Sequence, residues 1–202
     1  MARFATFRAG LRHNEGSALV EFAIALPILV VFIVGIYDFG GAFNEKQKIA
    51  QAAQEGAIVA AAQPANDIDS TNTNANGPVS VQPVVNTVFN SLVGSGVIPS
   101  GLCAPFGTVT QPGSALTWSY KITGCNPNPL YSSDSLIITI NRGWACSGAP
   151  CSTAPPYSIG STVTVQYPYH WRFYSVIQLV VPGAHYATVT DLQEAATVHN
   201  QS

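Results

Sequence analysis

The four cysteines of this chain are its most reactive residues, and all of them lie in the C-terminal half. Thiolates bind zinc, but the sequence has no Cys-x-x-Cys pair, and neither His170 nor His185 stands at a ligand spacing from a cysteine. An even number of cysteines beyond an apolar N-terminal segment is typical of disulfides formed in an oxidising compartment. We therefore predict two disulfides and no metal site. Of the three possible pairings, we favour the one that keeps both loops local, Cys103–Cys125 with Cys146–Cys151.

A hydrolase triad can be assembled on paper from Asp134, the many serines and histidines 170, 185 and 199. The sequence has no Gly-x-Ser-x-Gly elbow, HExxH, P-loop or GxGxxG motif that would support such a site. We therefore predict no catalytic residue and no cofactor. A set of aromatic residues in strand-like segments is a candidate for binding carbohydrate, but aromatic residues at strand positions more often belong to the core. This set is Trp118, Trp144, Tyr167, Tyr169 and Trp171.

A carboxylate borders the most apolar part of the chain. Residues 22–37 carry no charge, and Glu21 directly precedes them. As a helix these residues span about 24 Å, whereas residues 17–37 span about 31 Å and match a hydrocarbon core of about 30 Å. An acidic residue at the centre of such a helix costs about 2.5–3.5 kcal/mol, and less near its end. We therefore expect Glu21 to have a partner in the membrane.

The basic residues predict the orientation of this membrane span. Arg3, Arg8 and Arg12 precede it, and no acidic residue occurs before Glu15. The positive-inside rule therefore leaves residues 1–16 in the cytoplasm and translocates the C-terminal bulk. The alternative is a secretory signal peptide that is cut after Gly40-Gly41-Ala42, which would make the protein an exported or anchored binding or adhesion module.

The remaining pattern predicts an α+β protein. The helix is expected to run to Gln63, where Pro64 ends it, with a kink at Pro27 and an apolar stripe. The stripe consists of Phe43, Ile49, Ala53, Ala57 and Ala60. A short amphipathic helix is expected from Val81 to about Gly94.

Strands are expected in three later segments, at residues 116–122, 135–140 and 161–167. The segments 175–181 and 188–198 fit either a strand or a helix. We therefore expect a long N-terminal transmembrane helix that extends into a small, mostly β extracytoplasmic domain. The expected division is a leader at 1–16, the helix at 17–63, a polar linker at 64–79 and the α+β domain at 80–202.

The composition excludes two other classes of protein. Charged residues make up only 9% of the chain, and 8 Lys+Arg stand against 10 Asp+Glu. A nucleic-acid binder needs a surplus of basic residues to neutralise phosphates, so we predict no nucleic-acid partner. A disordered chain is usually rich in charge and poor in apolar residues, whereas 47% of these residues are hydrophobic.

The segment from Asn14 to Pro27 combines a Gly at the membrane boundary, a Glu five positions later, an aromatic residue beside it and a Pro inside the span. This pattern resembles the class III signal of type IV pilin-like proteins, and more specifically the TadE-like minor pseudopilins of tight-adherence (Tad) pili. That family opens with a short basic leader, a Gly, a Glu-Phe or Glu-Tyr pair and an Ala-Leu-Pro-type helix. The resemblance is dense over residues 14–62, faint over 162–198 and absent from 64–160.

The resemblance implies a structural role in the bacterial inner membrane, with the N-terminus in the cytoplasm. A prepilin peptidase would cut between Gly16 and Ser17, because Gly16 has no side chain to obstruct the protease. Glu21 would then be residue five of the mature chain, and Glu21, Phe22 and Pro27 would serve helix register and assembly. The implied partners are the membrane, the peptidase, other pilins or pseudopilins and the Tad secretion machinery.

Physical chemistry gives Glu21 a specific role after such a cut. The new amine at Ser17 would have a pKa near 8 and would be mostly protonated at neutral pH. It lies within about one helical turn of Glu21, on the same subunit or on a staggered neighbour. Pairing reduces the desolvation cost of both charges and would set the register of packed helices. The competing interpretation is that Glu21 stays hydrated at the level of the lipid headgroups.

Overall fold

The computed structural model describes residues 14–64, 67, 74–111, 116–145, 159–173 and 188–200. The chain divides into two compact units. One comprises Met1–Phe39 and Arg172–Tyr186, and the other comprises Gly40–Trp171 and Ala187–Ser202. The chain therefore passes between the units within the N-terminal helix and at both ends of the 172–186 segment.

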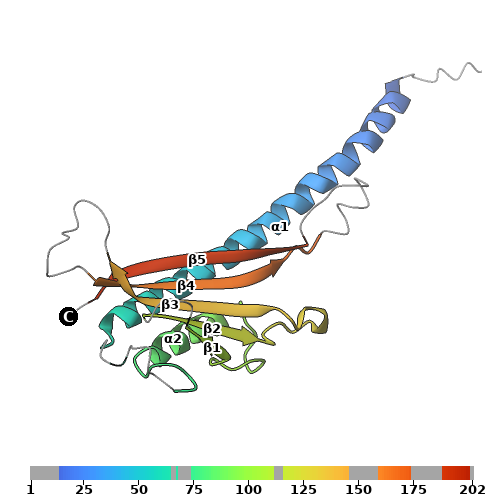
Figure 1. The fold of residues 1–202 in the computed structure, drawn as a ribbon. Helices are drawn as coiled ribbons and strands as arrows, with labels where there is room; N and C mark the ends of the chain where they lie inside the picture. Colours follow the sequence, from blue (N-terminus) through green and yellow to red (C-terminus); the bar gives the residue numbers. More distant parts are fainter. Residues whose placement is uncertain are drawn as a thin grey trace, which may run out of the picture. The chain divides into compact units, whose positions relative to one another are not determined.

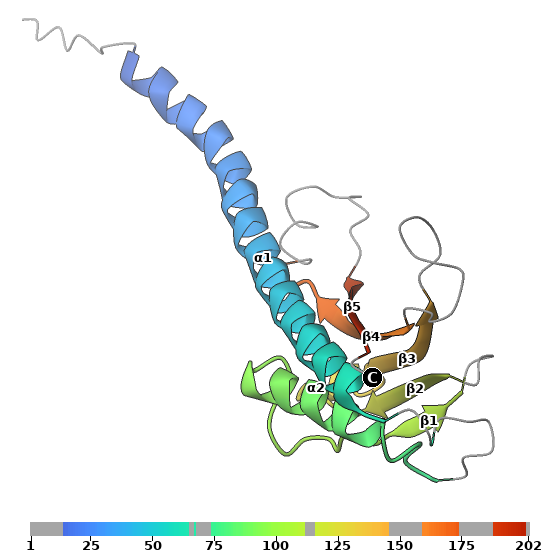
Figure 2. The same ribbon diagram turned by 90° about the vertical axis from the view of Figure 1, so that its left-hand side faces the viewer.

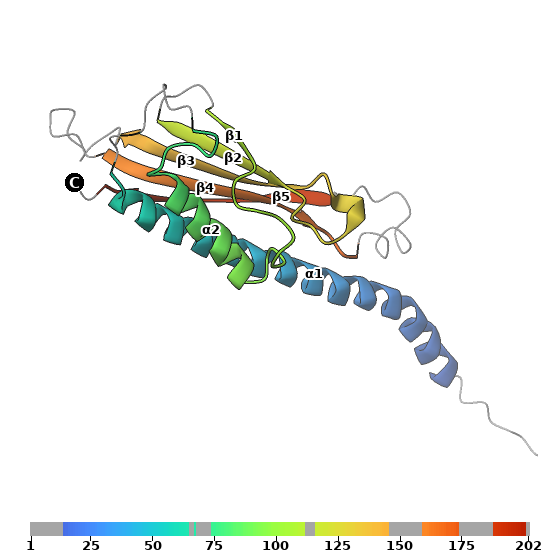
Figure 3. The same ribbon diagram turned by 90° about the horizontal axis from the view of Figure 1, so that it is seen from below.

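The predicted N-terminal helix is confirmed as α1 (Asn14–Ala62). It continues through Pro27, and its blue N-terminal part curves in Figure 3. Within the described ranges, α1 is the one helix long and apolar enough to cross a membrane, and its most apolar window has a mean hydropathy of 2.8. None of that window is buried by the rest of the protein. Most of the apolar span is therefore exposed in the described part of the chain.

The second unit contains one antiparallel sheet of five described strands, arranged in chain order (Figure 1). The strands are β1 (Thr108–Thr110), β2 (Thr117–Thr123), β3 (Ser135–Ala145), β4 (Ile159–His170) and β5 (Val189–His199). The three predicted strands are therefore confirmed as β2, β3 and β4, and the last two are longer than the patterns indicated. The ambiguous segment 188–198 forms β5 because it pairs along its whole length with β4. The other ambiguous segment, 175–181, lies outside the described residues.

Two helices cover one face of this sheet, as Figures 2 and 3 show. They are the C-terminal part of α1 and α2 (Gln82–Gly94), which confirms the predicted amphipathic helix. Side chains from α1, α2 and alternate positions of the strands form one hydrophobic core. Ile49, Val88 and Tyr120 are representative members, each fully buried. The α+β class is thus confirmed.

The predicted apolar stripe of α1 is correct except at Phe43. Ile49, Ala53, Ala57 and Ala60 are fully buried, whereas Phe43 is 67% exposed. Six residues separate Phe43 from Ile49, and at about 100° per residue this step falls about 120° short of two full turns. Ala42, seven residues before Ile49, lies on the buried face instead.

One predicted disulfide is confirmed, and it joins Cys103 to Cys125. The other predicted pair, Cys146–Cys151, lies outside the described residues, as does the side chain of Trp144. Trp118, Tyr167 and Tyr169 are at most 6% exposed, so these three belong to the core as expected and present no aromatic binding surface.

Candidate functional site

The five residues expected to serve processing and assembly all lie on the N-terminal part of α1. Gly16 and Ser17 are in its first turns, and Glu21 follows Ser17 by four residues, which is about one turn. Every residue from 16 to 30 is exposed, and Phe22 retains 64% of its accessible surface. A Cβ atom added at Gly16 would meet nothing within 4 Å. The peptide bond between Gly16 and Ser17 is therefore open to an approaching protein.

The apolar span presents a continuous hydrophobic surface to its surroundings. Large exposed side chains occur on every side of the helix: Leu19, Val20, Phe22, Ile24, Leu26, Ile28, Leu29, Val30, Phe32, Ile33 and Ile36. A soluble monomer rarely exposes an apolar patch larger than a few hundred Å², and a larger patch marks a contact with protein or membrane. A helix that is hydrophobic all round is typical of a membrane span.

At the C-terminal end of the apolar span, the first unit contains a cluster that sequence reasoning missed. Asp38 is only 2% exposed, and its Oδ1 accepts a hydrogen bond of 3.3 Å from the backbone N–H of Arg172. The rings of Tyr37 and Phe173 meet edge to face, with 5.8 Å between their centroids. The sequence indicated this cluster only weakly. Asp38 is the first charged residue after the apolar run, but nothing in the sequence points to Arg172 or Phe173 as its neighbours.

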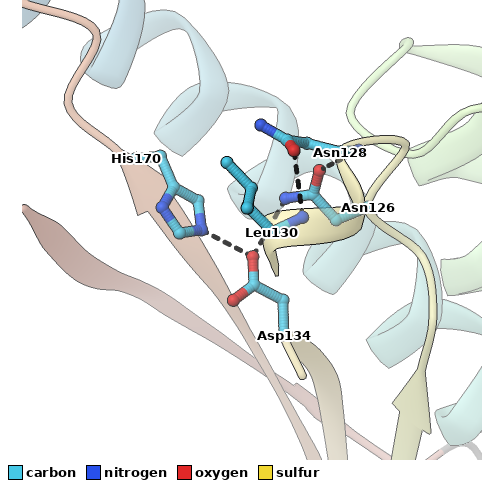
Figure 4. A network of polar contacts seen from close by, with 5 residues as sticks. All are labelled: Asn126, Asn128, Leu130, Asp134 and His170. Atoms are coloured by element: carbon cyan, nitrogen blue, oxygen red, sulfur yellow. Dashed lines mark hydrogen bonds and ion pairs between the residues drawn. The ribbon is translucent and has the colours of Figure 1, made fainter. Parts of the chain in front are cut away.

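A polar cluster in the second unit joins the β2–β3 connection to the end of β4 (Figure 4). His170 Nε2 lies 2.6 Å from Asp134 Oδ2, which also accepts a hydrogen bond of 2.9 Å from the side-chain amide of Asn126. The ring of Tyr131 stacks on the His170 ring, with 3.6 Å between centroids. The structure thus brings together the Asp134 and His170 of the triad considered above.

Among the residues that the structure describes, no serine is brought to this pair to complete a hydrolase triad. The printed sequence contains many serines, but in the described residues the contacts of His170 are with Asp134 and Tyr131 and include no hydroxyl nucleophile. His185 lies outside the described residues, and His199 is at the opposite end of the paired strands, since β4 and β5 are antiparallel and His199 faces Gly160. The pair therefore holds the β2–β3 connection against β4.

A third polar cluster lies where α1 ends. Asp67 accepts two hydrogen bonds from Ser80, one from its backbone N–H at 2.8 Å and one from its hydroxyl. Burial acts to raise the pKa of Asp67, but these hydrogen bonds outweigh it and lower that pKa below its ordinary value. Arg142 on β3 is 2% exposed and donates to the backbone oxygen of Gln63. Burial lowers the pKa of Arg142, and the nearby charge of Asp67 acts in the opposite direction.

A groove of about 850 Å³ runs between α1 and β5. Its lining contains one ionisable side chain, Glu194, which forms an ion pair of 3.1 Å with Lys46. The rest of the lining consists of amide, hydroxyl and apolar side chains from residues 47–58 and 195–198. Within the described ranges, no group of three His, Cys, Asp or Glu side chains is placed to hold a metal ion. The groove therefore offers neither an acid–base pair nor a set of metal ligands.

Comparison with known proteins gives one match. The family model of TadE-like proteins matches residues 16–57, which lie within α1. No curated protein and no solved structure matches the chain. The matched range contains Gly16, Ser17, Glu21, Phe22 and Pro27, which are the residues that carried the resemblance in the sequence. The N-terminal helix of this chain is therefore similar to TadE-like proteins, a family of structural pilus components.

Proposed function

We propose that this protein is a minor pseudopilin of a Tad-type adhesive pilus. In this proposal it is inserted in the bacterial inner membrane, with residues 1–16 in the cytoplasm and the folded domain outside. A prepilin peptidase processes it, and it then packs through its apolar N-terminal helix against other pilins and pseudopilins. The proposal rests on one observation: the TadE-like match falls on a helix whose most apolar window is not buried by the described part of the chain.

Processing would occur between Gly16 and Ser17. A protease that must reach the peptide bond is helped by a residue without a side chain, and Gly16 has open space where a Cβ atom would be. The bond lies near the start of α1, where the first four N–H groups of a helix have no intrahelical acceptor. Opening this first turn therefore costs fewer hydrogen bonds than opening the middle of the helix would.

Assembly would use the carboxylate of Glu21. After cleavage, the amine of Ser17 lies about one turn away along α1, or next to Glu21 of a neighbour shifted by that distance. Two charges that neutralise each other near lipid lose less solvation energy than two isolated charges. The pairing would therefore favour one stagger between neighbouring helices, and movement into a filament would exchange lipid contacts for helix–helix contacts.

The mass of the mature N-terminus tests the processing step. The protein purified from membranes of the producing cell should begin at Ser17, and Gly16→Leu should leave the leader attached. Gly10→Leu is the matched control, because it changes a glycine of the leader away from the cut and should be processed normally. A mature chain that begins near Phe43 would instead support the secreted binding module.

The role of Glu21 is tested by assembly. Glu21→Gln keeps the shape of the side chain and removes its charge, so it should reduce the amount of assembled pilus at least about tenfold, the effect of 1.4 kcal/mol. Glu15→Gln is the control, since cleavage removes Glu15 together with the leader. Normal assembly with Glu21→Gln would refute the pairing while leaving the processing step intact.

A further inference from the structure

The turn that leaves β4 belongs to the same compact unit as the apolar helix. This unit joins Met1–Phe39 to Arg172–Tyr186, although the two segments are more than a hundred residues apart in the chain. Of the second segment, the structure describes Arg172 and Phe173. Both residues contact α1 where its apolar span ends.

The end of that span is well defined by the sequence. Residues 22–37 carry no charge, and Asp38 is the first charged residue after Glu21. In a helix that crosses a bilayer, such a change marks the lipid–water boundary, where Tyr and Trp side chains are enriched. Tyr37 is 64% exposed and Phe39 is 55% exposed, so aromatic rings flank the boundary on α1 itself.

The contacts of the turn place it at this same level. The ring of Phe173 meets the ring of Tyr37 at 5.8 Å between centroids. One residue earlier, the backbone N–H of Arg172 donates to Asp38 Oδ1 at 3.3 Å. Two successive residues of the turn therefore contact two successive residues of α1.

We propose that the Arg172–Phe173 turn is a second membrane contact of this protein, seated at the lipid–water boundary beside Tyr37. The partner is the bilayer itself. The inference rests on the proposed membrane span, but it adds an attachment point that the family match, at residues 16–57, does not include.

The chemistry of the turn suits this partner. Phe173 supplies an apolar ring that can contact the acyl chains. Arg172 is exposed, so its long side chain can keep the positive charge at the level of the lipid headgroups. The sequence from Phe173 to Thr190 contains no Asp, Glu, Lys or Arg. Contact of the Phe173 ring with lipid therefore carries no cost of desolvating a permanent charge.

The hydrogen bond to Asp38 gives the contact a fixed geometry. A buried carboxylate oxygen at the boundary needs a donor, and the backbone of Arg172 provides one. Arg172, which follows β4 by two residues, is thereby attached to α1. The turn would therefore give the first unit a second contact with the membrane, in addition to the apolar span of α1.

Tryptophan fluorescence in vesicles with brominated acyl chains tests the proposal on the full-length chain. Bromine quenches tryptophan on contact, so three variants are compared after subtracting the quenching of the unsubstituted chain. Phe173→Trp tests the turn, and Tyr37→Trp reports the boundary on α1. Ile58→Trp is the matched control, because Ile58 is similarly exposed at 61% but lies 21 residues further along the helix, which is about 31 Å.

The proposal predicts that Phe173→Trp is quenched to within about twofold of Tyr37→Trp, while Ile58→Trp adds no quenching. Quenching at Tyr37 but not at Phe173 would overturn the second contact and leave the membrane span standing. Quenching at neither position would overturn both. Equal quenching at all three positions would mean that the whole domain lies on the lipid, and it would overturn a contact confined to the turn.

Discussion

Arg142 Nη2 donates a hydrogen bond of 2.6 Å to the backbone oxygen of Gln63, so a side chain of β3 binds the main chain just beyond the end of α1. The last carbonyl groups of a helix lack intrahelical donors and carry a partial negative charge. A cationic donor at this point satisfies one such group and offsets part of that charge. The contact joins the C-terminal end of α1 to the sheet of the folded domain.

Arg142→Ala should lower the free energy of unfolding by about 2–4 kcal/mol, because it leaves a cavity and removes the donor to Gln63. Arg142→Met should cost less, since it fills the space and removes a buried charge whose Nε and Nη1 have no hydrogen-bond partner in the described residues. Urea unfolding of the full chain in detergent measures both changes. Lys121→Ala, at an exposed position on β2, is the control and should change stability by no more than about 0.5 kcal/mol. Equal stability of Arg142→Ala and the parent would contradict the contact.

Gly56 allows α1 to approach α2 and the sheet. A Cβ atom at this position would overlap Val88 Cγ2 and lie 3.3 Å from Val163 Cγ1. Gly56→Ala should therefore cost about 1–3 kcal/mol of stability by overpacking. Gly40→Ala is the matched control, because a Cβ atom there meets nothing within 4 Å and alanine favours the helix by up to about 1 kcal/mol.

The overpacking at Gly56 should be relieved by shortening its neighbour. In the double variant Gly56→Ala with Val88→Ala, the loss of stability should be smaller than the sum of the two single losses, because the added methyl group enters the space that Val88 vacates. Additive losses in thermal unfolding would show that Val88 is not the residue that limits the approach.

The Cys103–Cys125 disulfide closes a loop with a sequence separation of 22 residues. Replacing both cysteines by alanine should lower the free energy of unfolding by about 3 kcal/mol, because the unfolded chain regains the conformational freedom that the cross-link removes. Denaturant unfolding checks the loss, and peptide mapping without reductant checks the pairing in the parent. Finding Cys103 joined to Cys146 or Cys151 would refute the connectivity.

Low pH should lower the free energy of unfolding, and protonation of Asp67 should cause part of this loss. Its pKa in the folded protein lies below the ordinary 3.8, because Ser80 donates two hydrogen bonds to the ionised carboxylate. A carboxylate with a lowered folded pKa contributes stability above its unfolded pKa, and this contribution is lost as the pH falls through the folded value. The stability advantage of the parent over Asp67→Asn should therefore be constant at neutral pH and shrink below about pH 4.

Ser80→Ala provides the control for this pH dependence. It removes the hydroxyl donor and keeps the backbone N–H donor to Asp67, so its loss of stability with acid should be intermediate between the parent and Asp67→Asn. Denaturant unfolding at several pH values measures all three chains. An advantage of the parent over Asp67→Asn that persists unchanged at low pH would contradict the assignment.

The sequence alone determined the features that depend on local pattern. A long uncharged run predicts the apolar helix, and alternation of β-branched and aromatic residues predicts the strands, because burial repeats every 3.6 residues in a helix and every two in a strand. The grouping of Gly16, Glu21, Phe22 and Pro27 was likewise sufficient to indicate the TadE-like family, which the family match then confirmed. Their roles in processing and assembly remain proposals.

Only the tertiary structure decided which distant residues meet. Asp38 and Arg172 are 134 positions apart, Gln63 and Arg142 are 79 apart, and Asp134 and His170 are 36 apart. Each pair joins separate elements, so no local period brings its members together. Thr188–Val198 could not be assigned from sequence for the same reason: it becomes a strand through the hydrogen bonds that β4 offers along its edge, and that edge exists only once the sheet has formed.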